Sequence, residues 1–75
     1  MTGTLGHKMS AHLIEGEAYR RIMSGRAPET LTEFASQILG WFRQAYPAAS
    51  PLTLKDVEEQ IRATWHRRHE MIRGG

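Results

Sequence analysis

The stretch 31–46 constrains the fold most, because it separates into two faces when it is wound as an α-helix at about 100° per residue. One face is apolar and consists of Leu31, Phe34, Ala35, Ile38, Leu39, Trp41, Phe42, Ala45 and Tyr46. The other face is polar or small and consists of Thr32, Glu33, Ser36, Gln37, Gly40, Arg43 and Gln44. An apolar face this wide and this aromatic is unfavourable in water, so we expect other parts of the chain or a second molecule to cover it.

A first helix is expected over about 10–24, with Ser10 as its N-cap and Gly25 as the left-handed residue that closes it. Gly16 in its middle costs about 1 kcal/mol relative to alanine. Its apolar stripe consists of Ala11, Ile14, Ala18 and Ile22, with Tyr19 and Met23 on one flank. Residues 1–8 have no helical period and are predicted to form a flexible N-terminal arm.

The second and third helices are predicted from their start and stop signals. Pro47 ends the second helix, and nothing interrupts the third before Arg73. The starts are indicated by paired residues: Thr30 with Glu33 for the second helix, and either Ser50 with Pro51 or Thr53 with Asp56 for the third. The sequence therefore predicts an all-α fold, a small three-helix bundle with helices at about 10–24, 31–46 and 53–73, in which residues 9–75 form a single domain.

Length and composition exclude several classes of protein. A chain of 75 residues has a marginal core unless something else stabilises it. The absence of cysteine excludes disulfides, thiolate catalysis and cysteine-based metal sites. The sequence has no apolar run long enough to cross a bilayer, and it does not begin with the layout of a secretory signal. We expect a cytoplasmic protein with no membrane contact.

The predicted third helix has a narrow apolar seam that includes a charged residue. The seam is formed by Leu54, Val57, Ile61, Trp65 and Ile72, and Arg68 falls inside it. An arginine in such a position usually packs its aliphatic stem and leaves its head in water. The alternative is that Arg68 meets a carboxylate or a ligand at an interface.

The basic end of the same helix suggests nucleic-acid binding as an alternative function. Its candidate residues are Arg62, Arg67, Arg68 and Arg73, interleaved with Trp65 and two histidines. However, acidic residues precede basic ones in all three predicted helices, which the helix dipole alone explains. The net charge of only +2 adds little support, and the connector 47–51 is longer than the turn of a helix-turn-helix motif.

No motif in the sequence indicates catalysis. The chain lacks a glycine-rich phosphate loop and a recognisable Ser-His-Asp arrangement. His66, His69 and Glu70 have a spacing suited to two metal ligands, but the surrounding arginines oppose a bound cation. We predict that the protein is not an enzyme and has no cofactor and no metal site.

The first and third helices offer too little apolar surface to cover the second completely. We therefore predict a non-catalytic interaction or regulatory module, of a bacterial type, that associates as a homodimer or with another protein. The expected interface residues are Trp41, Phe42, Tyr46, Trp65, Arg68 and Ile72. A nucleic-acid-binding regulator that uses the basic end of the third helix remains the alternative.

Overall fold

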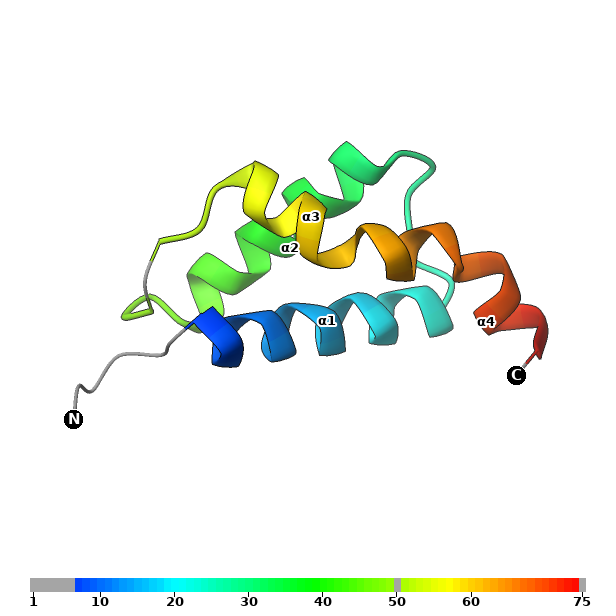
Figure 1. Cartoon of the computed structure of the whole chain (residues 1–75), viewed down its shortest axis with the longest axis horizontal. Coiled ribbons are helices and arrows are strands. Elements are labelled where there is room, and N and C mark those ends of the chain that lie inside the picture. The colour runs from blue at the N-terminus through cyan, green and yellow to red at the C-terminus, as the bar shows by residue number, and fades with distance from the viewer. Residues whose placement is uncertain (1–6, 50, 75) are drawn as a thin grey trace.

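The computed structural model describes residues 7–49 and 51–74, and these residues form four helices. The helices are α1 (His7–Met23), α2 (Leu31–Ala45), α3 (Leu54–His66) and α4 (Arg68–Gly74). In Figure 1, α1 and α3 run in the same direction and α2 runs in the opposite one, while α4 turns from the end of α3 toward the C-terminal end of α1. α3 packs against both α1 and α2, and α4 packs against α1. The predicted all-α bundle is confirmed.

The first helix differs from the prediction at its start and agrees with it at its end. α1 begins at His7, so Ser10 lies inside the helix and is buried instead of capping it. His7 and Lys8, which were assigned to a flexible arm, belong to α1, and residues 1–6 lie outside the described residues. Gly25 ends the helix with a φ of 76°, and the N–H of Arg26 donates to the carbonyl of Arg21 at 2.8 Å. This is the left-handed closing turn that the sequence predicts.

The starts of α2 and α3 are fixed by local side-chain caps. The hydroxyl of Thr30 accepts a hydrogen bond from the N–H of Glu33 at 3.1 Å. At α3 the cap is reciprocal: the hydroxyl of Thr53 accepts from the N–H of Asp56, and the Asp56 carboxylate accepts from the N–H of Thr53. Of the two predicted starts for this helix, Thr53 with Asp56 is the correct one.

The apolar face of α2 is covered largely by the chain itself. Phe42 at its C-terminal end is only 2% exposed, although Ala45 is exposed and Trp41 and Tyr46 are half-buried. The core comprises Ile14, Ala18 and Ile22 of α1, Phe34, Ala35, Ile38, Leu39 and Phe42 of α2, Val57 and Ile61 of α3, and Leu52 of the connector. The chain covers the apolar face of α2 more completely than the sequence predicts. Part of this burial comes from Leu52, which lies in a connector that shows no helical period.

The third predicted helix is interrupted. A turn at Arg67, with φ −96° and ψ 10°, separates α3 from α4. The N–H of Arg67 is shared between the carbonyls of Ala63 and Thr64, both at 3.2 Å, which tightens the end of α3. The N–H of Met71 then donates to the carbonyl of Arg67 at 3.0 Å, and α4 continues from there. The expectation of one unbroken helix over 53–73 was therefore wrong at this single residue.

Candidate interaction surface

The aromatic residues predicted at the C-terminal end of α2 lie together but are mostly enclosed. The ring centroids of Trp41 and Tyr46 are 5.8 Å apart with an edge-on geometry, and those of Phe42 and Tyr46 are 5.4 Å apart. Phe42 belongs to the core, so its ring does not face a partner. Trp41 and Tyr46 pack against the core with one side only. This cluster therefore offers two partly exposed ring edges to the outside.

The side chain of Arg68 is half-buried and lies against Trp65. Its guanidinium carbon is 3.7 Å from the centroid of the Trp65 ring, and its Nη1 donates to the Trp65 carbonyl at 2.9 Å. The indole Nε1 of Trp65 donates in turn to the carbonyl of Pro28 at 3.5 Å. Arg68 thus stacks on an aromatic face and satisfies a carbonyl at the end of α3. Neither of the two interpretations of Arg68 from the sequence included this arrangement.

The other residues of the predicted basic patch are dispersed. Arg62 is exposed on α3, and Arg67 is exposed at the turn with its Nε 4.0 Å from a Glu70 carboxylate oxygen. An exposed pair of this kind contributes little to stability. Arg68 is engaged with Trp65 and is half-buried. The side chains of Arg73 and Ile72 lie outside the described part of the chain.

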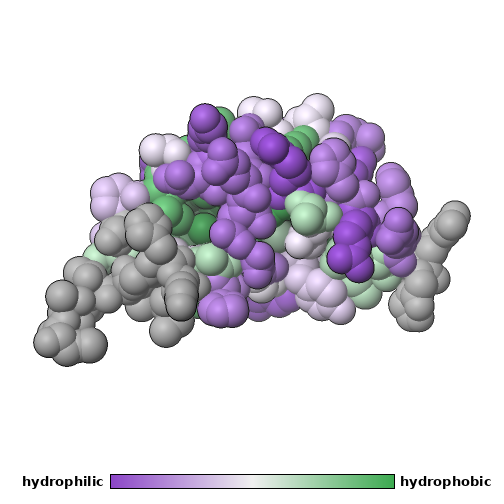
Figure 2. All heavy atoms as spheres, in the orientation of Figure 1, coloured by the Kyte–Doolittle hydropathy of each residue, from purple (hydrophilic) through white to green (hydrophobic). Residues whose placement is uncertain are grey.

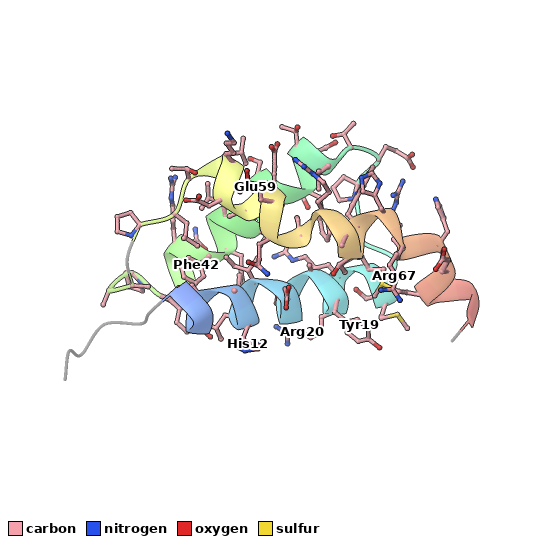
Figure 3. All side chains as sticks on the ribbon, viewed as in Figure 1. His12, Tyr19, Arg20, Phe42, Glu59 and Arg67 are labelled. Atoms are coloured by element: carbon pink, nitrogen blue, oxygen red, sulfur yellow. The ribbon has the colours of Figure 1, made fainter. Side chains whose placement is uncertain are left out.

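The most exposed large hydrophobic side chains lie on α1, which the sequence analysis did not select. Tyr19 is 53% exposed and Met23 is 43% exposed. With His12 and Gly16 they form one outer face of the helix, since positions 12, 16, 19 and 23 are three or four residues apart. In Figure 3, His12 and Tyr19 lie on the lower side of α1, away from α2. The signal for this face was available in the sequence, because Tyr19 and Met23 fall outside the buried stripe.

A groove of about 510 Å³ runs between this face of α1 and the junction of α3 with α4. It is lined by His12, Glu15, Gly16, Tyr19, Thr64, Arg67 and Met71. The groove is larger than the hollow of about 320 Å³ beside Phe42 and Tyr46, and larger than the one of about 240 Å³ beside Ser10 and Glu59. In Figure 2, hydrophobic and weakly hydrophilic atoms gather at the lower right, below a band of strongly hydrophilic atoms. The outer face of α1 and this groove form the candidate interaction surface.

One buried carboxylate lies on α1, outside this surface. Glu17 is 6% exposed, and it accepts hydrogen bonds from the Nε of Arg21 at 2.7 Å and from Nη2 of Arg20. Burial raises the pKa of Glu17, but the hydrogen bonds and positive charges of Arg21 and Arg20 outweigh burial and hold the pKa below its ordinary value of 4.5. Both partners lie on the same helix, so this cluster stiffens the C-terminal half of α1 and leaves the carboxylate fully partnered.

Further features bear on the kinds of site the surface could contain. Within residues 7–49 and 51–74, no three His, Asp or Glu side chains lie close enough together to hold a metal ion. None of the described helices is both long and apolar enough to cross a membrane. Comparisons of the chain with protein-family models, with curated proteins and with solved structures gave no match.

Proposed function

We propose that this chain is a small, non-catalytic interaction or regulatory module of a bacterial type that works in the cytoplasm by presenting a helical surface. Its partner is a second copy of the chain or another protein. The single observation that carries this proposal is the exposure of Tyr19 and Met23 side by side on α1, next to the groove. Aromatic and methionine side chains are enriched where proteins contact one another.

The structure changes which residues we propose for the contact. Phe42 is enclosed by its own chain, so it is omitted from the surface. Tyr19 and Met23 take its place at the centre, with Arg67 and Met71 on the far side of the groove. Trp41, Tyr46, Trp65 and Arg68 remain predicted contact residues, and they would form a second, smaller contact region.

Sedimentation velocity from low micromolar to millimolar concentration tests the proposal. The wild-type chain is expected to exceed its monomer mass of 8.6 kDa as the concentration rises. Replacing both exposed residues, Tyr19→Ser with Met23→Ser, should weaken self-association at least about tenfold, because each loses most of its apolar contact area. The matched control is Gln37→Ser with Gln44→Ser on the polar face of α2, which should leave association unchanged. A wild-type chain that stays monomeric over the whole range would count against self-association.

The nucleic-acid alternative is separated from this proposal by its salt dependence. Binding through phosphate contacts falls steeply as salt is added. Duplex DNA binding that is steeply salt-dependent, and that is lost in the Arg62→Ala, Arg67→Ala double variant, would establish the alternative. The Arg62→Ala single variant, which lies outside the proposed contact residues, should associate with a second copy as the wild type does if the proposed module is correct.

A further inference from the structure

The junction between α3 and α4 bends where the sequence favours a straight helix. Residues 54–73 contain neither glycine nor proline, and sharp helix kinks usually need one of these or an inserted side chain. The structure nevertheless turns the chain at one residue, Arg67. The bend is therefore not imposed by a local breaker, and other contacts must hold it.

Two contacts hold the bend. In an unbroken helix, the carbonyl of Trp65 would accept the N–H of His69. Here the same carbonyl accepts from Nη1 of Arg68. On the other side of the bend, Met71 packs against the core and lines the groove beside Tyr19. The bent arrangement therefore depends on one side-chain hydrogen bond and on the docking of α4 against α1.

A docked terminal helix on a one-residue hinge is the arrangement from which domain swapping arises. Exchanging an identical element between two copies keeps every contact of that element, so no new complementary surface has to exist. Short hinges promote the exchange, and here the residues on both sides of Arg67 favour a continuous helix. Straightening Arg67 would join α3 and α4 into one helix over 54–74 and carry α4 away from its own α1.

We propose that this chain forms a swapped homodimer in which α4 of each copy docks against α1 of the other. This inference rests on the proposed function, because it names a second copy as the partner and α4 as the segment that the partner inserts. The site is the one that α4 occupies in the monomer. Met71 lines the groove together with Tyr19, and His69 lines a smaller hollow together with Gly25, Ala27 and Glu29.

The exchange also explains why the outer face of α1 is apolar. Tyr19 lines the groove together with Met71 of α4, and Met23 lies one turn further along the same face of α1. A second copy whose α3 extends into its own α4 would bring that long helix across this end of α1. Tyr19 and Met23 would then become covered in the dimer, although α4 leaves them exposed in the monomer.

Two substitutions of the same residue separate a straightened hinge from a bent one. Arg68 is the first residue of α4, where glycine is tolerated, whereas glycine in the interior of a continuous helix is clearly less favourable than alanine. Both Arg68→Ala and Arg68→Gly remove the hydrogen bond to Trp65. Arg68→Ala is expected to raise the dimer fraction above the wild type, and Arg68→Gly is expected to weaken dimerisation several-fold relative to Arg68→Ala. Equal dimerisation of the two variants would overturn the swap.

Crosslinking tests the exchange directly, because the chain has no cysteine of its own. Copies with His69→Cys are mixed with copies of a different mass that carry Glu29→Cys, and a short bismaleimide is added. Both positions are exposed and line the same hollow. The swap predicts a crosslinked pair of unequal copies, in several-fold excess over the pair formed when Gln44→Cys replaces Glu29→Cys. No excess over this control would contradict the exchange, whichever Arg68 variants fold.

The outcomes distinguish the two proposals. A wild-type chain that remains monomeric at millimolar concentration removes both self-association and the swap. A chain that associates without the crosslink, and with equal affinity in the two Arg68 variants, associates through its surface alone. That result overturns the exchange of α4 and leaves the interaction module in place.

Discussion

The guanidinium of Arg68 lies flat over the indole of Trp65, 3.7 Å from the ring centroid, and donates to the carbonyl of the same residue. One side chain therefore makes two contacts with one neighbour three positions earlier. The stack fixes the orientation of Trp65, whose Nε1 reaches the carbonyl of Pro28. Through this pair, the end of α3 is joined to the loop between α1 and α2.

Replacing Arg68 with lysine tests the contribution of this stack. Lysine keeps the charge but lacks the planar group that covers an aromatic face and donates to a carbonyl at the same time. We expect Arg68→Lys to lower the free energy of unfolding by about 1 kcal/mol, measured by urea denaturation with circular dichroism. Arg62→Lys, at an exposed position of α3, is the control and should change it by less than about 0.5 kcal/mol. Equal effects at the two positions would mean that the stack adds no stability.

Glu17→Gln should destabilise the fold in a pH-dependent way. The pKa of Glu17 is lowered in the folded chain, so its ionised form is the stabilising one. Its contribution is therefore fully present above the ordinary pKa of 4.5 and is lost as the pH falls through the lower, folded-state value. At neutral pH we expect the variant to lose about 1–3 kcal/mol, because a charged acceptor of two arginines is replaced by a neutral amide.

Urea unfolding of wild type and Glu17→Gln between pH 7 and pH 3 provides the measurement. The difference between the two proteins should be constant near neutrality and shrink below pH 4.5. The control is Glu33→Gln, which is exposed and should show a small effect throughout. A difference between wild type and Glu17→Gln that grows on acidification would have the wrong sign for a lowered pKa.

Two glycines should respond to alanine in opposite directions. At Gly16, an added Cβ would meet nothing within 4 Å and the residue lies inside α1, so Gly16→Ala should raise stability by about 1 kcal/mol. At Gly25 the φ of 76° penalises any side chain, so Gly25→Ala should lower stability by about 1 kcal/mol. Thermal denaturation of the two variants gives the signs. Stabilisation at both positions would show that the turn after α1 does not need a left-handed residue.

Phe42 and Tyr19 provide a test of which aromatic side chains belong to the core. Phe42 is enclosed within one chain, so Phe42→Ala should cost about 3–5 kcal/mol and leave most of so small a domain unfolded. Tyr19→Ala should change stability by less than about 0.5 kcal/mol, because the side chain is mainly exposed. Both effects should be independent of protein concentration at low micromolar levels. A strong dependence for Phe42→Ala would indicate that this ring is covered between copies.

Much of the fold follows from local patterns in the sequence. The face of α2 that contains Phe34 and Ile38 is buried as its period predicts, and the helix ends follow from Thr30, Thr53 and Gly25. These features depend on a few neighbouring residues, so they can be read without knowing the tertiary contacts. The all-α class follows from them.

The structural features that the sequence did not predict depend on contacts between distant segments. Leu52 carries no helical signal, yet it completes the core, so the sequence overestimated how much of α2 stays uncovered. No glycine or proline in the sequence predicts the turn at Arg67. The docking of α4 against α1 determines this turn. The sequence placed Tyr19 and Met23 on the flank of a helix, but the larger aromatic residues of α2 were predicted as interface residues instead. The sequence therefore directed attention to the aromatic residues of α2 and α3, whereas the structure adds the exposed face of α1 as a candidate surface.

The hydrogen bonds that define the ends of α1, α2 and α3 connect near neighbours in the chain: Arg26 with Arg21, Thr30 with Glu33, and Thr53 with Asp56. Each helix can therefore form with its final bounds before it packs against the others. Folding then consists mainly of the packing of helices whose lengths are already determined. Chains dominated by such local order reach the native state within microseconds to milliseconds. A newly made copy would bury its apolar core before it encountered many unfolded neighbours, which protects the chain from aggregation.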